Sequence, residues 1–502
     1  MVNTVSTPKK ADVSTPSVRY DTMREKFSWD LISDLLDGTK AMRKGATKWL
    51  PKQEAESQTA YENRLDRSFL FEGLGNTIDR LSAKPFKKQV TWAPTEGLDP
   101  ALEAVFKDVD KKGRSVTQFG YDLFRTSLKW GLSHVLVDFN TMKFFDKNDV
   151  PRTATIAEEK SAGARPVWSE ISPLNLFFWK VGEDTKLDEI RYFQSFISSE
   201  GDFGDEVVKQ IKRWTRTKWE LWQESKNADS SSTWVLKESD THTFGEIPLV
   251  TYYTDQDGDL TAKPPFLKLA WLNLTHWQSY SDQRSLLNVA RAGVLFIKGV
   301  TQEQVDNGIT IGPRAQFATA NHEADMKWVE HSGNSIKVGQ DDIMDIENKM
   351  TVVGTEPLVI TSPSVSATGR AIDANDNESA VQAWIRREEE ALNKSAEFSA
   401  RWLNKKLPKD FSFDIFNDFG VVFSNKEDLT ILFNMRAAKE ISQTTFLTEL
   451  KRRSVLSENV NIEDEIEAIL AEGPALGLIT GDDDDPDDDG TNQDDSELEM
   501  DE

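Results

Sequence analysis

The stretch KPPFLKLAWLNLTHWQSYSDQRSLLNVARAG, residues 263–293, decides how this chain is organised. Two prolines stand near its start, and apolar residues then recur at intervals of three and four with polar residues between them. This pattern predicts an amphipathic helix. From Phe266 to Arg291 such a helix would be roughly 40 Å long at about 1.5 Å per residue. We therefore expect a rod that leaves the globular body.

An insert and a second helix follow this rod in the sequence. Residues 293–298 are a β-like run, 302–306 favour a short helix, and the glycines and proline of 308–313 break regular structure. A helix is expected over 341–354, and the polar segment 355–377 is expected to be a mobile loop. Two rods that flank an insert predict a projecting hairpin.

A third long helix is expected over residues 378–403. Its start is assigned to a capping-box variant in which Asn375 is the cap and Glu378 follows three residues later. The buried stripe of this helix includes Glu388 and Ser395, so it is not purely apolar. Two explanations stay open, namely contact with a neighbouring subunit and a partly solvated helix within the chain.

Elsewhere the patterning predicts an α+β body with a helical C-terminal part. Residues 166–253 have a period close to two, which is typical of strands. The expected helices are 20–44, 57–81, 102–111, 116–132, 426–439, 444–453 and 462–472. The expected strands are 88–92, 134–138, 167–171, 176–179, 190–197, 207–223, 234–237 and 411–416.

Composition limits the class of protein. The 502 residues, 38% of them hydrophobic, can form two to four core-bearing units. No run of about 18 apolar residues is present, so no membrane span is expected. Residues 1–17 lack the apolar core of a signal peptide, so export is not expected. The absence of cysteine excludes disulfides and thiolate metal sites and suits a reducing cytosol.

The net charge of −25 is unevenly distributed. Thirteen acidic residues and no Lys or Arg lie in 482–502, so the first 481 residues carry −12. The acidic tail is expected to be disordered. Proteins that hold nucleic acid by neutralising phosphates are normally basic, at least locally. If this chain meets DNA, it is built to avoid binding it tightly.

The sequence contains little that points to catalysis. It has no phosphate-binding loop and no G-x-G-x-x-G motif, and its five histidines have no ligand spacing. Asp255, Asp257 and Asp259 could gather around a divalent cation, although a solvated turn is favoured. A basic and aromatic cluster could contact nucleic acid, although a two-sided strand pair is favoured. Its residues are Lys209, Lys212, Arg213, Arg216 and Lys218, with Trp214, Trp219 and Trp222.

Several stretches, in their order and spacing, resemble one branch of the portal proteins of tailed bacteriophages. The resemblance covers roughly residues 20–475. The stretches are Trp49-Leu50-Pro51 with Glu56, Tyr61 and Arg64; Asn76-Thr77-Ile78 with Lys84-Pro85-Phe86; Gly245-Glu246-Ile247-Pro248 leading into Leu269 to Arg291; Gly308 to Pro313; Ser332-Gly333 through Met350 to Gly354; and Glu440 to Gln443 with Leu447.

The resemblance implies a predominantly helical α+β ring subunit with wing, stem, clip and crown regions. Carried over by position, its regions would be a disordered arm (1–19), wing (20–260), first stem helix (263–292), clip (293–338), second stem helix (339–354), tunnel loop (355–377), long wing helix and strand (378–424), crown helices (425–480) and a disordered acidic tail (481–502). This chain departs from the family pattern in that its second stem helix is short by pattern.

The resemblance also implies a function and partners. The chain would form a homo-oligomeric ring, usually of twelve subunits, at one capsid vertex, through which double-stranded viral DNA is packaged and ejected. It would act in the virion, and in the host cytoplasm during assembly. Implied partners are the terminase large subunit, a head-completion or adaptor protein, and the major capsid and scaffolding proteins. No membrane, catalytic residue, cofactor or metal is implied.

An acidic bore would repel duplex DNA and leave it free to slide. The hypothesis for the lining is Asp341, Asp342, Asp345 and Glu347, with Thr361, Ser364, Ser366 and Arg370 in a loop that touches DNA. Ile309, Ile311 and Pro313 are the hypothesis for docking partners at the clip. Two alternatives stay open: a metal-dependent nucleic-acid-processing enzyme that uses the Asp255 to Asp259 turn, and a non-channel minor head or scaffolding protein.

Overall fold

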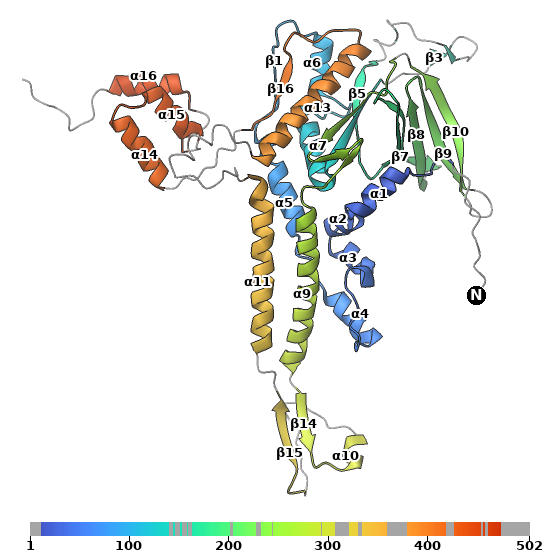
Figure 1. Cartoon of the computed structure of the whole chain (residues 1–502), viewed down its shortest axis with the longest axis vertical. Coiled ribbons are helices and arrows are strands. Elements are labelled where there is room, and N and C mark those ends of the chain that lie inside the picture. The colour runs from blue at the N-terminus through green and yellow to red at the C-terminus, as the bar shows by residue number, and fades with distance from the viewer. Residues whose placement is uncertain are drawn as a thin grey trace, which may run out of the picture. The chain divides into compact units, whose positions relative to one another are not determined.

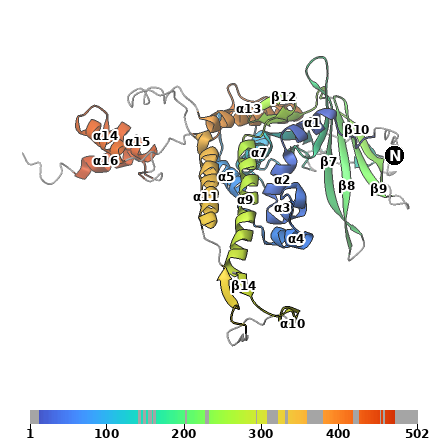
Figure 2. The ribbon, with the colours of Figure 1, turned by 60° about the horizontal axis from the view of Figure 1, so that its bottom comes forward.

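The computed structural model describes most of the chain, in two compact units that are treated separately. Unit 1 is Met1–Asn417 and unit 2 is Asp418–Glu502. The described residues are 12–139, 144–145, 151–152, 158, 163–200, 204–226, 232–242, 244–292, 294–306, 321–329, 334–358, 379–417, 426–452, 455–456 and 460–472. Figures 1 and 2 show two views of the ribbon.

Unit 1 begins with short helices rather than with the single helix expected over 20–44. Ser28 and Gly38 have φ values of 53° and 83°, and a residue in this left-handed region ends a helix. The disordered arm expected through residue 19 is also wrong for 12–19, because Ser17 caps the first helix and donates its backbone N–H to Phe177 O. The helices are α1 (Val18–Lys26), α2 (Trp29–Leu36) and α3 (Thr39–Gly45), followed by the 3₁₀ turn η1 (Ala46–Lys48).

The second predicted helix, 57–81, is likewise divided. It consists of α4 (Gln58–Arg67) and α5 (Gly73–Ser82), joined by the segment Ser68 to Glu72. A 3₁₀ turn, η2 (Pro85–Lys87), leads on to α6 (Pro100–Lys107) and α7 (Val116–Trp130). Ser115 and Gln118 form a capping box at the start of α7, and Gly131 ends it with a φ of 88°.

A three-stranded antiparallel sheet of order β11-β2-β5 forms the centre of the body. Helix α13 (Ala380–Trp402) packs on it, since the Trp168 indole N–H donates to Ser399 Oγ at 2.8 Å and that of Trp402 donates to Val137 O at 2.9 Å. The strands are β2 (Leu132–Phe139), β5 (Pro166–Ile171) and β11 (Leu249–Tyr253).

A five-stranded antiparallel meander of order β10-β9-β8-β7-β6 forms a second sheet. The single strand expected over 207–223 is two strands, because the chain turns at Arg216 and Thr217 and pairs Trp214 with Trp219. The strands are β6 (Leu176–Val181), β7 (Leu187–Glu200), β8 (Gly204–Thr215), β9 (Lys218–Lys226) and β10 (Ser232–Thr241).

Short strand pairs complete the body. Trp92 and Phe413 pair across one of them and pack with Phe106 and Trp168 into an aromatic cluster. The pairs are β1 (Thr91–Ala93) with β16 (Ser412–Asp414), β3 (Phe144–Phe145) with β4 (Pro151–Arg152), and β12 (Gln256–Gly258) with β13 (Thr261–Ala262).

A helical hairpin connects β13 to α13. It consists of α9 (Leu267–Ala292), β14 (Val294–Lys298), α10 (Gln302–Asp306), β15 (Asp325–Val329), α11 (Asn334–Thr355) and η3 (Glu356–Leu358). In Figures 1 and 2, α9 and α11 lie side by side, and β14 and β15 lie at the end of the hairpin away from the body. No helix among the described residues is long and apolar enough to cross a membrane.

Unit 2 has three described helices close to those expected. Leu432, Leu447 and Leu450 are buried, and the rings of Phe433 and Phe446 lie 5.2 Å apart. The helices are α14 (Lys426–Ala437), α15 (Gln443–Arg452) and α16 (Ile462–Glu472). The acidic tail from residue 481 lies outside the described residues.

Candidate functional site

The seam between α9 and α11 contains buried polar contacts as well as apolar packing. His276, which is almost completely buried on α9, donates from Nε2 to Glu347 Oε1 on α11 at 3.1 Å. Nearer the tip, Gln283 Nε2 donates to Ile336 O at 2.8 Å. A side chain at Gly339 would meet Gln283 Oε1 at 2.1 Å, so the Gln283 side chain packs directly on this glycine and would have to shift to admit a larger residue. These contacts fix which residues of the two helices face each other.

Helix α11 is longer than the sequence pattern predicts. The expected stem helix, 339–354, begins at Asn334 instead, although Ile343, Ile346 and Met350 are buried as the pattern requires. The first turns are polar and have little apolar periodicity. Their packing against Gln283 is a tertiary contact that local patterning does not show.

The four predicted lining carboxylates do not share one environment. Asp341 and Asp342 are exposed, and Asp345 is exposed with an ion pair to Lys349 at 2.6 Å. Glu347 instead faces the seam, where it accepts the hydrogen bond from His276. Three of the four therefore point away from α9. Thr361, Ser364, Ser366 and Arg370 of the predicted loop, and Ile309, Ile311 and Pro313 of the predicted clip, lie outside the described residues.

A buried arginine attaches α4 to the other side of α9. The Arg64 side chain, 5% exposed, contacts Glu56 Oε2 at 2.9 Å and Asp282 Oδ1 on α9 at 3.2 Å. It also donates to Pro51 O at 2.8 Å. Hydrogen bonding to Glu56 is the main cause that raises the pKa of Arg64 and lowers that of Glu56. Arg64 belongs to the stretches that suggested the resemblance, but its role as a clamp was not predicted.

Asn273 attaches the segment between α4 and α5 to the same helix. Its side chain donates to Phe71 O at 2.8 Å and accepts from the Leu74 N–H at 2.9 Å. The Phe71 ring lies 5.0 Å from the ring of His276. One face of α9 therefore contacts α11, and the adjoining face contacts this segment.

Two carboxylates of the acidic turn at 255–259 lie near cations of α1. Asp257 pairs with Lys26 of α1 at 2.6 Å, and Asp259 lies 3.8 Å from Arg19 of the same helix. Within the described ranges, no group of three or more His, Asp or Glu side chains could hold a metal ion. The favoured interpretation as a turn agrees with these contacts, which attach the turn to α1.

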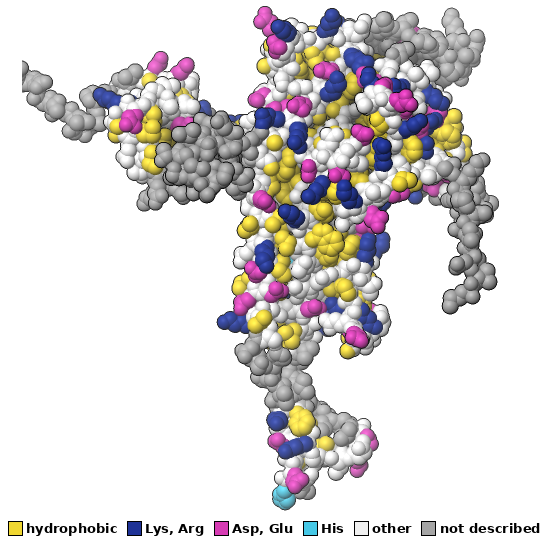
Figure 3. Space-filling view, viewed as in Figure 1, with side chains coloured by type: hydrophobic (Ala, Val, Ile, Leu, Met, Phe, Trp, Pro, Cys, Tyr) yellow, Lys and Arg dark blue, Asp and Glu magenta, His cyan; other side chains and the backbone are white. Residues whose placement is uncertain are grey.

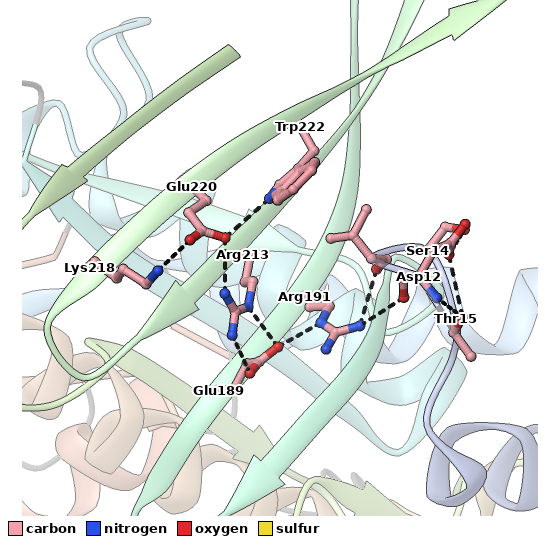
Figure 4. A network of polar contacts seen from close by, with 10 residues as sticks. Asp12, Ser14, Thr15, Glu189, Arg191, Arg213, Lys218, Glu220 and Trp222 are labelled. Carbon is pink, nitrogen blue, oxygen red and sulfur yellow. Dashed lines mark hydrogen bonds and ion pairs between the residues drawn. The ribbon is translucent and has the colours of Figure 1, made fainter. Parts of the chain in front are cut away.

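The basic and aromatic cluster is neutralised within the protein. Lys212 is paired with Asp138 at 2.6 Å, Arg216 with Asp184 at 2.5 Å, and Lys209 lies 3.9 Å from Glu224. In Figure 4 the remaining cations form a chain of contacts across three strands and reach the segment at Asp12. Its members include Lys218, Glu220, Arg213, Glu189 and Arg191. Every predicted cation thus has a carboxylate partner, which supports the structural interpretation.

Helix α13 differs from its prediction at its start, whereas its predicted buried stripe, which includes Glu388 and Ser395, is confirmed. It begins after Ser379, whose side chain forms a capping box with Gln382, and not at Asn375, which lies outside the described residues. Glu388 and Ser395 are both fully buried within the chain, and Ser395 Oγ donates to Ala391 O. The explanation by a partly solvated helix was therefore wrong for these two residues.

Glu388 is a buried acid whose carboxylate oxygens have no hydrogen-bond partner among the described residues. Burial, and after it the charge of Glu389, raise its pKa well above the usual value. The hydroxyl of Tyr252, also buried without a partner there, has a raised pKa because of burial and the nearby Glu388. Sequence reasoning placed Glu388 in the buried stripe, but it could not show that α7 packs close to the carboxylate at Gly120.

Three further histidines lie in the described part of the chain. His134 is buried, bonds to Thr251 Oγ1 at 2.9 Å, and has its pKa lowered by burial to about 3. His242 Nε2 lies 3.0 Å from Thr215 O, and His322 is exposed. His331 lies outside the described residues.

Comparisons with known proteins give a family match over the hairpin and α13. A family model described as "Domain of unknown function (DUF4055)" matches residues 265–403. This range runs from just before α9 to just after α13. No curated protein matches the chain.

Solved structures match over most of the chain at low similarity. One titled "Neck of empty GTA particle computed with C6 symmetry" has 13% identity and a TM-score of 0.41, covering 75% of this chain and 89% of that chain. "Virion of native gene transfer agent (GTA) particle" has 12% identity and a TM-score of 0.41, covering 82% and 97%. "Neck of native GTA particle computed with C12 symmetry" has 12% identity and a TM-score of 0.36, covering 75% and 89%.

Proposed function

We propose that this chain is the subunit of a portal-like ring through which double-stranded DNA passes into and out of a phage capsid. The observation that carries the proposal is the hairpin of α9 and α11, which extends from an α+β body and has a two-stranded β-ribbon at its far end (Figure 1). Body, rod, insert, rod and long helix follow one another in the order that the sequence resemblance implies. The three structural matches carry no weight in this proposal because their TM-scores are low.

The hairpin suits the wall of a channel. At about 1.5 Å per residue, the 22 residues of α11 span roughly 33 Å. The seam contacts and the Arg64 clamp stiffen it, and a head-to-tail contact repeated around a closing rotation would place such rods side by side around an opening. The wall of the opening would then consist of helices rather than loops.

We further propose that the exposed carboxylates of α11 contribute to an acidic bore. Asp341, Asp342 and Asp345 lie on the face of α11 turned away from the seam. Duplex DNA carries one negative charge per roughly 1.7 Å, so such a surface repels the backbone and gives it no strong point of attachment. Glu347 contributes less, because it is engaged with His276. Terminase and an adaptor protein are the proposed partners of the clip.

Electron microscopy of the purified protein tests the ring directly. Negative staining should show discs with a central opening. In a sedimentation measurement, a non-channel head or scaffolding protein would instead behave as a monomer or dimer. Particles without an opening at every salt and protein concentration would refute the proposal.

The acidic bore has a separate test in a reconstituted packaging motor. Asp341→Asn, Asp342→Asn and Asp345→Asn together should slow or stall packaging, while Glu347→Gln alone should change it less. Lys337 offers a control, because Lys337→Gln removes an exposed charge from the same helix and leaves the lining acids and the Asp345–Lys349 pair in place. Unchanged packaging velocity in the triple variant would contradict the lining.

A further inference from the structure

A half-exposed tryptophan stands on one flank of α9, beside a cavity. Trp271 is 49% exposed and lines a cavity of about 390 Å³ together with the buried Trp49 and Leu31. Charged side chains of α1, α2 and η1, including the Asp30 and Lys48 pair, form the rest of its lining. Apolar side chains also gather near the body end of α9 on the face seen in Figure 3. This combination of aromatic floor and polar rim is typical of a protein contact.

A second aromatic patch lies on the opposite flank of the same helix. Phe69 and Phe71, in the segment between α4 and α5, are 59% and 40% exposed. The Phe71 ring packs on His276, which in turn stacks on Tyr280 with ring centroids 5.7 Å apart. Asn273 and His276, which contact Phe71, are two and five residues from Trp271, or about 200° and 140° around the helix at 3.6 residues per turn. Phe71 therefore lies on the side of α9 roughly opposite Trp271.

The two patches also lie at nearly the same level along α9. Asn273 holds both Phe71 O and the Leu74 N–H. It is two residues from Trp271, so the levels differ by only about 3 Å at about 1.5 Å per residue. If the ring axis is parallel to the hairpin, the rotation that relates two copies does not shift them along that axis. The Phe71 patch of one copy would then lie at the same level as the Trp271 patch of its neighbour.

Charge is complementary as well. Lys268, one turn before Trp271, is exposed, and Glu72, next to Phe71, is exposed. Neither forms an ion pair within the described part of the chain. A cation thus flanks the cavity and an anion flanks the aromatic segment.

We propose that the Phe69 to Phe71 segment of one copy docks in the Trp271 cavity of the next copy, with Glu72 beside Lys268. The inference rests on the proposed function and names the surfaces that join its subunits. Opposite, complementary patches at one level make a head-to-tail contact, which closes into a ring when the rotation closes. The partner is a second copy because this chain itself presents both halves of the contact.

Crosslinking tests the contact without relying on its strength. The chain has no cysteine, so Phe69→Cys combined with Thr275→Cys, an exposed position one turn after Trp271, introduces one thiol on each flank. A short bismaleimide should join the double variant into covalent multimers up to the full ring on a denaturing gel. Each single variant should remain monomeric. A double variant that forms rings but stays monomeric on the gel would overturn the inference.

Substitution tests the energetic role of the same contact. Trp271→Ala should raise the protein concentration needed for ring assembly by about tenfold or more, as for a central aromatic contact. Val338→Ala, at a 68% exposed apolar position on α11, is the matched control and should leave assembly unchanged. Lys268→Glu and Glu72→Lys should each weaken ring assembly when made alone. The double variant that combines them should restore it.

The outcomes separate this inference from the function on which it rests. Wild-type protein that never forms perforated rings refutes the proposed function. Wild-type rings that persist unchanged in Trp271→Ala, at every concentration tried, refute only the proposed contact.

Discussion

Replacing Glu388 by glutamine should change how the stability of unit 1 depends on pH. The carboxyl group is 0% exposed, and its pKa is raised well above the usual value because of burial. In the unfolded chain the group ionises near its ordinary pKa, whereas in the folded chain it stays neutral. Folding of the wild type therefore binds a proton once the pH exceeds that ordinary value.

The sign and size of the effect follow from this proton. A group with a raised folded pKa stabilises the protein below its unfolded pKa, and that contribution is lost as the pH rises. The free energy of unfolding of the wild type should fall, relative to Glu388→Gln, by about 1.4 kcal/mol per pH unit above the ordinary glutamate pKa. The decline should continue until the pH reaches the raised pKa of Glu388.

Denaturant unfolding of both proteins at pH 5, 6, 7 and 8 measures this difference. Glutamine has its own cost of burial, but that cost does not vary with pH, so only the slope decides. Glu390→Gln, at an exposed position on the same helix, is the control and should follow the wild type. Parallel pH profiles for wild type and Glu388→Gln would show that Glu388 ionises in the folded protein.

Two further substitutions test the clamp and the strand network. Arg64→Met should lower the free energy of unfolding by about 3–5 kcal/mol, because it leaves Glu56 largely buried without its cation. Arg67→Met, at an exposed position, is the control and should change the free energy of unfolding by less than about 0.5 kcal/mol. Equal losses in the two variants would contradict the clamp. Burial opposes ionisation of Glu220, but hydrogen bonds from Lys218 and Arg213 outweigh it and lower its pKa to about 2. Glu220→Gln should therefore lower the free energy of unfolding by up to about 3 kcal/mol at pH 7. This difference between wild type and variant should disappear as the pH falls from about 4.5 towards 2. If acid unfolding still showed the full difference at about pH 2, the network would be contradicted.

The sequence pattern correctly predicted several helices whose signals lie within the segment itself. Helices α10 and α16 have the predicted bounds, and α9 starts within a residue of its predicted first turn. Helix α16 carries clear apolar periodicity, and prolines precede the first turn of α9. Strand β15 had no prediction, because Asp325–Val329 is defined by pairing with β14 across a long gap in sequence.

The errors occur where tertiary contacts decide. The apolar spacing of 20–44 fits one helix, and the break at Ser28 has no glycine or proline to mark it. The pattern placed Glu388 in the buried stripe, but the packing of α7 against α13 near its carboxylate is a contact that no single stretch of sequence contains. For the candidate site, the pattern placed Asp341 and Asp345 on an exposed face but could not show that Glu347 turns to His276. Whether the exposed acids face a bore depends on neighbouring copies rather than on one chain.

The polar seam explains why the hairpin can act as a rod of fixed length. A purely apolar seam between α9 and α11 would tolerate sliding by one turn, since one apolar side chain can replace another at similar cost. Sliding would separate His276 from Glu347 and Gln283 from Ile336 O, and it would move Gly339 away from the Gln283 side chain that packs on it. Unpaired buried polar groups cost about 1–3 kcal/mol each, so the seam strongly favours one register. The same register sets the level of α11 relative to Trp271 and Phe71 on α9, so every copy would present its two flanks to its neighbours at matching levels.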